Sequence, residues 1–201
     1  WYVKPSPDDE LPTKRTGAYI SLIQIAEKKA MPILGICGGM QMLAGFYGAK
    51  LCRKIKKSDI DHRHIDANHY AHSIIIEPKT ILADIADDAL RVKVNSRHSE
   101  AIETIPESKM IVSAKATDGV IEAIELINHK SFVLGVQWHP ERMAVQNEDF
   151  ASEIYMRLTQ EAKIYKQKIM ALNLQRAFLV YNLFIVFCIL VYGYGHSRTT
   201  R

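Results

Sequence analysis

A cysteine followed by two glycines lies between an apolar segment and a helical pattern, and this arrangement constrains the fold more than any other feature of the chain. Residues 33–36, Ile-Leu-Gly-Ile, form a short apolar run that is typical of a buried parallel strand. Cys37 follows, and residues 40–47 have the pattern of a helix that ends at a glycine. Residues 16–30 also show apolar spacing near the helical period. The order helix, strand, tight turn, helix predicts an α/β domain.

The turn itself, Gly35-Ile36-Cys37-Gly38-Gly39, is the thiol counterpart of a nucleophile elbow. In such a turn the nucleophile adopts a strained backbone, and the crowding around it demands glycine at positions 35 and 39. We expect the following helix to direct its N-terminus at the Cys37 sulfur, which would lower the pKa of the thiol. The backbone N–H of Gly38 would then donate to a developing oxyanion. A buried structural cysteine beside a glycine turn is the alternative that this pentapeptide alone leaves open.

A thiol nucleophile needs a base, and residues 135–141, Gly-Val-Gln-Trp-His-Pro-Glu, supply a candidate. His139 ends a predicted strand, and Glu141 lies two positions further on. A turn at Pro140 can bring the carboxylate back to the imidazole and fix its tautomer. A surface histidine at a strand end and a solvated glutamate are the alternative interpretations.

The remaining pattern extends the α/β prediction. A long helical pattern runs from Phe150 to Leu172, and residues 51–75 are polar, rich in histidine and without a clear prediction. Four segments have the composition of strands, and the last two are joined by a hairpin turn at 128–130: residues 91–94, 110–116, 119–127 and 132–138.

Residues 35–41 and 135–141 together resemble the class I glutamine amidotransferase domain. The likeness is strongest to its free-standing branch, the peptidase C26-like γ-glutamyl hydrolases that include γ-glutamyl-γ-aminobutyrate hydrolase. Residues 94–99, Val-Asn-Ser-Arg-His-Ser, and 116–123, Ala-Thr-Asp-Gly-Val-Ile-Glu-Ala, fit that branch in the expected order. The resemblance extends over about residues 1–160.

The resemblance implies a flavodoxin-like fold and a hydrolytic mechanism. A largely parallel central sheet flanked by helices would carry an antiparallel extension near residues 119–138. Cys37 would attack a γ-glutamyl amide, His139 would act as general base and acid, and Glu141 would orient His139. A small-molecule γ-glutamyl substrate is implied, and the chemistry requires no cofactor.

Three further residues are implied on the substrate side. Gln41, one helical turn past the nucleophile, resembles the family's substrate-contacting glutamine. His98 and Ser99 stand where the family places a substrate-side loop, with a structural strand end as the alternative.

The N-terminal part departs from the family pattern. Family members place several strand–helix units before the elbow, including a glycine-rich loop that completes the oxyanion hole, whereas only residues 1–36 precede the nucleophile here. We therefore expect an N-terminally incomplete domain whose first strands are missing and whose sheet has an unpaired edge. Loss of one oxyanion donor costs about 10²–10³ in turnover in a measured case. Weak activity is expected unless an N-terminal segment complements the chain, and the exposed edge also favours a homo-oligomer.

Two other functions stay open. The domain could supply ammonia as the glutaminase subunit of a synthase, or it could be a catalytically impaired remnant that acts as an interaction module. A thiol peptidase of related fold is disfavoured by the full motif at residues 135–141.

The C-terminal end is an addition to the family domain, which we place at residues 1–172, with an extension at 173–201. Residues 177–195 approach the roughly 20 apolar residues that span a bilayer. Membrane association through this stretch is one interpretation. Two other interpretations stay open. The stretch could be a core element that fills the space of the missing strands, or it could be an extension without a role.

Charge, cysteine and histidine content set further limits. The net charge is only +4, and the densest basic run, residues 53–57, has no interleaved aromatic side chains, so no nucleic-acid partner is expected. Three cysteines are too few for a disulfide framework, and no cleavable secretory signal opens the chain, which favours a cytoplasmic location. Metal binding is not expected, because no cysteine pair or His-Glu helix motif accompanies four scattered histidines: His62, His64, His69 and His72.

Overall fold

The computed structural model describes most of the chain, with side chains omitted at 14–15 and 180–196: residues 14–52, 54–55, 59–63, 70–143 and 149–196. His64, His69 and most of the basic run at 53–57 lie outside the described residues. The chain forms two compact units, residues 1–161 and 162–201. The predicted division into residues 1–172 and 173–201 stays a prediction.

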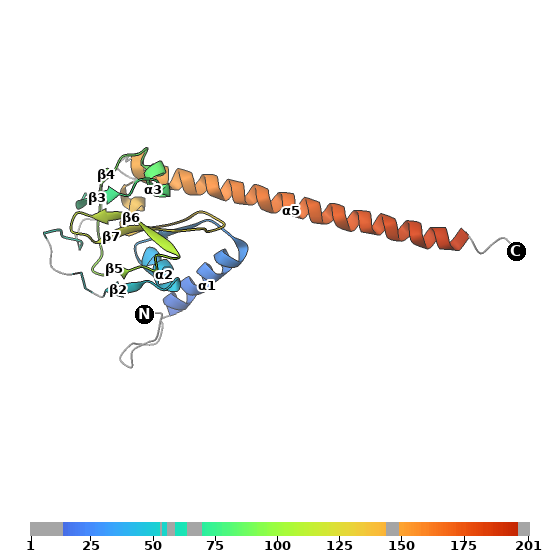
Figure 1. Ribbon diagram of the computed structural model, residues 1–201, viewed down its shortest axis with the longest axis horizontal. Helices are drawn as coiled ribbons and strands as arrows, with labels where there is room; N and C mark the ends of the chain where they lie inside the picture. The colour runs from blue at the N-terminus through green and yellow to red at the C-terminus, as the bar shows by residue number, and fades with distance from the viewer. Residues whose placement is uncertain (1–13, 53, 56–58, 64–69, 144–148, 197–201) are drawn as a thin grey trace. The chain divides into compact units, whose positions relative to one another are not determined.

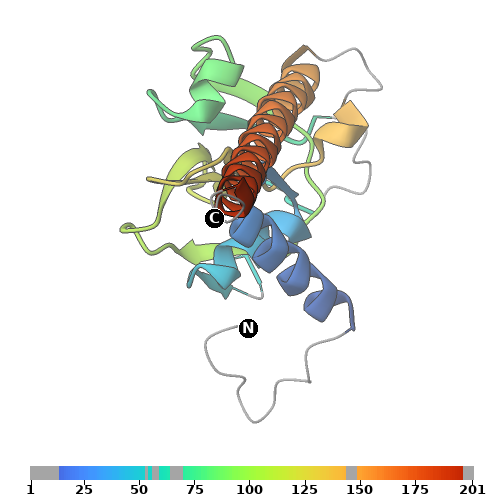
Figure 2. The ribbon, with the colours of Figure 1, turned by 90° about the vertical axis from the view of Figure 1, so that its right-hand side faces the viewer.

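The elbow unit has the predicted order (Figure 1). Helix α1 (Lys14–Lys29) is followed by strand β1 (Ile33–Ile36), and helix α2 (Gly38–Phe46) begins directly after Cys37. Helices α1 and α2 pack on each other, as Figure 2 shows in dark and light blue. These three elements confirm the sequence prediction: β1 has the predicted ends, and the ends of the two helices differ by one or two residues.

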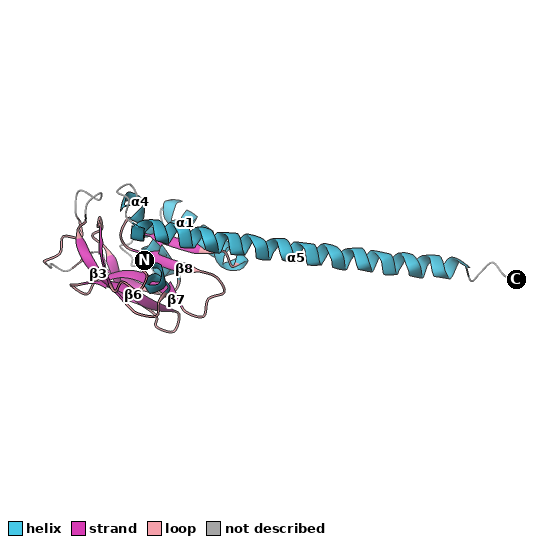
Figure 3. Cartoon of the chain, turned by 90° about the horizontal axis from the view of Figure 1, so that it is seen from above, coloured by secondary structure: helices cyan, strands magenta, loops and turns pink. Residues whose placement is uncertain are grey.

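Six strands form the main sheet, in the order β1-β8-β7-β6-β3-β4. Figure 3 shows β3, β6, β7 and β8 among them. The sheet adds five strands to β1: β3 (His72–Ile76), β4 (Arg91–Val94), β6 (Met110–Ala116), β7 (Ile121–Leu126) and β8 (Val133–Val136). Within the described residues β1 pairs only with β8 and is an edge strand, as expected. Strands β2 (Lys50–Cys52) and β5 (Ala101–Thr104) form a separate antiparallel pair.

The sheet is mixed and contains less parallel pairing than the sequence analysis predicted. Among the described strands, β1 and β8 run parallel, and every other neighbouring pair is antiparallel. The reason lies in the connections. Residues 117–120 and 127–132 join β6 to β7 and β7 to β8, and such short hairpins are compatible only with antiparallel strands, since a parallel crossover needs a dozen or more residues. The α/β class is confirmed.

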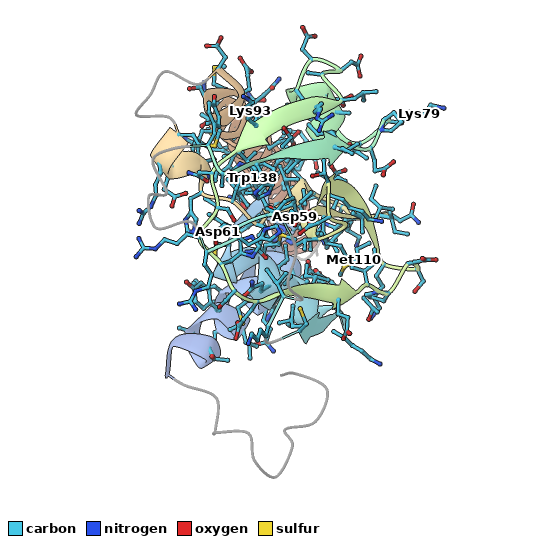
Figure 4. All side chains as sticks on the ribbon, turned by 90° about the vertical axis from the view of Figure 1, so that its left-hand side faces the viewer. Asp59, Asp61, Lys79, Lys93, Met110 and Trp138 are labelled. Atoms are coloured by element: carbon cyan, nitrogen blue, oxygen red, sulfur yellow. The ribbon has the colours of Figure 1, made fainter. Side chains whose placement is uncertain are left out.

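Both faces of the sheet are covered. Alternation along β8 directs Leu134 and Val136 into a core with α3 (Ile81–Ile85), α4 (Pro140–Met143) and the first turns of α5 (Asp149–His196). Trp138, which lies in this interior, is fully buried, whereas Lys79 projects outward (Figure 4). On the opposite face, Val133 packs with α1 and α2.

The apolar C-terminal stretch, residues 177–195, lies within helix α5, and the side chains of 180–196 are outside the described part of the chain. In the part that is described, no helix combines the length and apolar character that crossing a membrane requires. Membrane association through 177–195 stays a prediction.

Candidate active site

The two halves of the predicted site meet where β1 and β8 end. Ile36 pairs with Val136 in parallel register, and the Cys37 N–H donates to the Val136 carbonyl at 2.8 Å. Because parallel neighbours present their carboxyl ends at the same edge, Cys37 and the segment from Gln137 to Glu141 emerge together. This edge is where ligands bind in open α/β sheets.

The turn at Cys37 has the strain expected of a nucleophile elbow. Its φ is 49° and its ψ −109°, a conformation that a side chain with a Cβ rarely adopts. At Gly35 a Cβ would lie 2.9 Å from the Met40 nitrogen, so the demand for glycine is confirmed there. At Gly39 a Cβ would meet nothing within 4 Å, so the same expectation is wrong for that position. Gly135, opposite Gly35, is required as well, because its Cβ would lie 2.9 Å from Met40 Cγ.

The protonation of the thiol differs from the expectation. Burial raises the pKa of the Cys37 thiol, and the negative charges of Glu141 and Glu122 raise it further. The backbone N–H of Gly38, at the start of α2, bonds to the sulfur and lowers the pKa, but it does not outweigh burial. The predicted net lowering is therefore wrong for the unliganded protein, since desolvation of the sulfur exceeds the effect of one helix terminus. The resting sulfur needs a base to accept its proton.

A buried amide chain also reaches the sulfur. Gln137 Nε2 lies 3.6 Å from Cys37 Sγ, and Gln137 Oε1 accepts a hydrogen bond from Gln41 Nε2 at 3.1 Å. Gln41 Nε2 also donates to the Glu100 carbonyl at 3.0 Å, which fixes the orientation of both amides, since a carbonyl can only accept. Gln137 therefore presents its NH₂ group to the sulfur. No sequence pattern identified this role, although Gln137 stands inside the motif that carries His139.

The His139–Glu141 pair forms as predicted. His139 Nδ1 and Glu141 Oε1 are 2.7 Å apart, with 17% and 45% of the two side chains exposed. The His139 backbone is held by Asn95, whose Oδ1 accepts from the His139 N–H at 2.8 Å while its Nδ2 donates to the His139 carbonyl at 2.9 Å. A carboxylate on Nδ1 leaves Nε2 of the neutral ring free to accept a proton. Proton transfer between this nitrogen and Cys37 stays a prediction.

The residues predicted on the substrate side lie in different environments. Gln41 is buried, and its amide nitrogen bonds within the protein. His98 is also buried and directs Nε2 toward Glu122 at 3.4 Å. Ser99 is exposed, and its carbonyl accepts from the Ile55 N–H at 3.0 Å. Contact of these three residues with substrate stays a prediction.

One group of residues was not anticipated. Glu122, fully buried on β7, is surrounded by His62, His72 and His98. Although burial raises the pKa of Glu122, the three imidazoles hold it well below its usual range. The histidine-rich segment was visible in the sequence, but only the fold brings these side chains together.

A cysteine on an elbow and a His–Glu pair at the same sheet edge define a class of protein, the class I glutamine amidotransferase-like hydrolases. The sequence model of one family, peptidase C26, matches residues 3–141. The chain belongs to the peptidase C26 family.

Curated proteins similar in sequence to this chain are named as glutamine amidotransferase-like proteins or as γ-glutamyl-γ-aminobutyrate hydrolases. A glutamine amidotransferase-like protein of Rickettsia prowazekii is 34% identical over 163 residues, covering 61% of this chain and 57% of the relative. The γ-glutamyl-γ-aminobutyrate hydrolase of Escherichia coli K12 is 32% identical over 130 residues, covering 61% of this chain and 50% of the relative. The chain thus spans about half the length of the curated relatives it matches.

Solved structures support the fold. A glutamine amidotransferase from Thermotoga maritima matches with a TM-score of 0.51 and 18% identity, over 88% of this chain and 73% of that one. A Thermoplasma acidophilum protein described as one of the subunits of GMP synthase matches with a TM-score of 0.57 and 16% identity, over 78% of this chain and 68% of that one. At these identities the likeness concerns the fold.

Proposed function

We propose that the protein is a cysteine hydrolase that cleaves the amide bond of small γ-glutamyl compounds through a γ-glutamyl thioester. The observation that carries the proposal is the position of Cys37 on a strained elbow, at the sheet edge that also holds the bonded His139–Glu141 pair. A thiol, a base and an orienting carboxylate are the parts that nucleophilic amide hydrolysis requires.

The first half of the reaction forms the thioester. His139 Nε2 takes the thiol proton as the Cys37 sulfur attacks the γ-carbonyl carbon, and the carbonyl oxygen becomes an oxyanion that accepts from the Gly38 N–H. The imidazolium then gives its proton to the amide nitrogen, the C–N bond breaks, and the amine leaves. Glu141 stabilises the imidazolium that exists between these steps.

The second half regenerates the thiol. His139 removes a proton from a water molecule, whose oxygen attacks the thioester carbonyl. The C–S bond breaks, glutamate is released, and the sulfur recovers its proton. Gln137, whose NH₂ group faces the sulfur, assists departure of the thiolate by donating to it.

The acyl side of the substrate is supported by the names of the relatives, since both glutamine and γ-glutamyl-γ-aminobutyrate carry a γ-glutamyl amide. The proposal is tested by incubating the purified chain with γ-glutamyl-γ-aminobutyrate and measuring the amine released. Wild type and C52S, which removes the other free cysteine of the described residues, should release amine at the same rate, and C37A should release none. Equal rates for wild type and C37A would overturn the proposal.

A second candidate is a glutaminase that supplies ammonia to a synthase, which relatives named as glutamine amidotransferases favour. Competition between glutamine and γ-glutamyl amines separates the two functions. The hydrolase proposal requires a larger kcat/KM for the substituted amine, whereas a preference for free glutamine, with ammonia as the product, favours the glutaminase.

A further inference from the structure

A second site lies beside the catalytic residues, around the buried carboxylate of Glu122. Three imidazole nitrogens face the same oxygen, Glu122 Oε1: His62 Nδ1 at 3.4 Å, His72 Nε2 at 3.2 Å and His98 Nε2 at 3.4 Å. The carboxylate is 0% exposed, and all three histidines are buried. Four segments far apart in the sequence thus direct polar atoms at one point inside the molecule.

These contacts are close, but they are not hydrogen bonds. In the described part of the chain, the three facing nitrogens and both oxygens of Glu122 are buried polar atoms without a hydrogen-bond partner. Buried polar groups left in this state cost about 1–3 kcal/mol each, and native structures rarely keep several of them together. One central partner could satisfy all of these atoms at once.

The ring nitrogens of His62 and His98 that face away from Glu122, here called the outer nitrogens, indicate the kind of partner that would fit the cluster. His62 Nε2 lies 2.9 Å from Asp118 Oδ2, and His98 Nδ1 lies 3.0 Å from the Glu100 carbonyl oxygen. Both partners are acceptors, so both outer nitrogens carry hydrogen. If the rings are neutral, the inner nitrogens of His62 and His98 then present lone pairs to a carboxylate. Like partial charges face each other unless a cation lies between them.

We propose that this cluster is a binding site for a divalent transition-metal ion of the zinc type, with His62 Nδ1, His98 Nε2 and Glu122 Oε1 as ligands and His72 Nε2 as the fourth. The first three ligand atoms lie within 4.8 Å of one another. Tetrahedral zinc with bonds of 2.0–2.1 Å separates its ligands by about 3.3 Å. The separations of 3.2–3.4 Å between Glu122 Oε1 and the imidazoles have this size. The spacing between the imidazole nitrogens is the part of the geometry that an ion would have to draw together.

The hydrogen-bond partners of the histidine rings also match those of a metal site. Histidines that bind metal commonly donate the other ring N–H to a carboxylate or a backbone carbonyl, which fixes the tautomer and the ring orientation. Asp118 does this for His62, and the Glu100 carbonyl does it for His98. The proposal revises the expectation from the sequence, where the histidines show no recognisable ligand spacing.

With His72 as the fourth ligand no position stays open, so the proposed role of the ion is structural. It ties His62, His72 and His98 to strand β7. The Glu122 carbonyl accepts from the Gln137 N–H at 2.8 Å, so the site supports the backbone of the residue that contacts Cys37 Sγ. The proposal does not depend on the hydrolase activity, and metal binding is measured without substrate.

The test uses the whole chain, stripped with a chelator and titrated with Zn²⁺ and with Co²⁺. Wild type should bind one equivalent, show the intense visible absorption of tetrahedral Co²⁺, and unfold at a higher temperature with the ion than without it. H98Q should lose the Co²⁺ absorption. The matched control H129Q removes a histidine that bonds to Glu27 outside the cluster and should bind like wild type.

A second variant keeps the test valid if H98Q fails to fold. D118N keeps all four ligands and removes only the carboxylate behind His62, so it should bind with about 10- to 100-fold weaker affinity. No uptake by wild type, with an unfolding temperature that is indifferent to Zn²⁺ and to chelator, would overturn the proposal and assign the cluster to protonated imidazoles. Equal affinity of wild type, H98Q and D118N would overturn it as well.

Discussion

At the scale of single residues, the reactivity of Cys37 depends on opposing influences on one sulfur atom. Burial and two carboxylates raise the pKa of the thiol, while the Gly38 N–H and the Gln137 amide lower it. Because the effects that raise the pKa outweigh those that lower it, little thiolate exists at neutral pH. The fraction of Cys37 in the thiolate form increases as the pH rises toward the elevated pKa. The mechanism therefore relies on proton transfer to His139 during attack rather than on a preformed thiolate.

Replacing Gln137 by Leu should slow alkylation of Cys37 at neutral pH. The variant removes a donor to the sulfur, so the pKa rises further and the alkylation profile moves to higher pH, by about tenfold in rate for each unit of pKa. Iodoacetamide labelling across a pH series, resolved by peptide mass spectrometry, measures the shift. Cys52 in the same sample is the control and should keep its profile. An unchanged Cys37 profile would refute a role for the Gln137 amide.

Replacing Glu141 by Gln should lower kcat for γ-glutamyl amide hydrolysis with little change in KM. The amide no longer stabilises the His139 imidazolium and can select the wrong tautomer, a change that costs about 10⁴ in a fully buried triad. Since 45% of the Glu141 side chain is exposed, water replaces part of the carboxylate, and we expect a loss of about 10²-fold. Steady-state kinetics separate the two constants. A raised KM with an unchanged kcat would place Glu141 in binding.

At the scale of elements, the elbow unit depends on close approach between β1 and α2. The backbone of α2 passes over Gly35, and Met40 of α2 packs on Gly135 of β8. These two glycines let the helix sit directly on the two strands that carry the site. The same local pattern made the unit predictable, because an apolar strand, a glycine turn and a helix are adjacent in the sequence.

Gly35→Ala should destabilise the protein, whereas Gly39→Ala should not. The new Cβ at position 35 would lie 2.9 Å from a backbone nitrogen, and overpacking of this kind costs about 1–3 kcal/mol. At position 39, inside α2, the Cβ enters open space, and alanine should stabilise by about 0.5–1 kcal/mol. Urea unfolding of the two variants gives both values. Equal destabilisation at the two positions would contradict the packing described for the elbow.

At the scale of the whole molecule, the sequence patterns predicted local elements better than their assembly. Strand β6 was predicted with its observed ends, and β4 likewise, because alternation and composition are local properties. The predicted share of parallel pairing was too high, since it came from the family likeness rather than from the short connections around β7. Strands β2, β3 and β5 lie in or beside polar segments, so no pattern identified them.

The candidate site also has parts that were predictable from local sequence and parts that depend on the assembled fold. Cys37, His139 and Glu141 were predictable because each motif holds its own chemistry within a few residues. The direction of the shift in the Cys37 pKa was not predictable, because burial of the thiol depends on the assembled fold. The cluster around Glu122 was missed for a related reason, since its ligands come from four separate segments that only the sheet brings together.

Removing residues 173–201 should leave the stability of the sheet-bearing unit unchanged. The buried residues of the described chain end at Ile154, and the first compact unit ends at residue 161. We expect the free energy of unfolding to change by less than about 0.5 kcal/mol, as for surface changes away from the core. Urea unfolding followed by the fluorescence of the fully buried Trp138 measures it. A loss of several kcal/mol would show that the extension belongs to the fold.

The central claim is that the sulfur of Cys37, activated by His139, is the atom that attacks a γ-glutamyl carbonyl. It is tested most directly by treating the chain with a diazo-ketone analogue of glutamine and locating the adduct by peptide mass spectrometry. We predict one adduct on Cys37, protected by excess γ-glutamyl-γ-aminobutyrate, formed much more slowly in H139Q, and absent from Cys52. An unmodified Cys37, or labelling of Cys37 and Cys52 at equal rates with no effect of H139Q, would contradict the account.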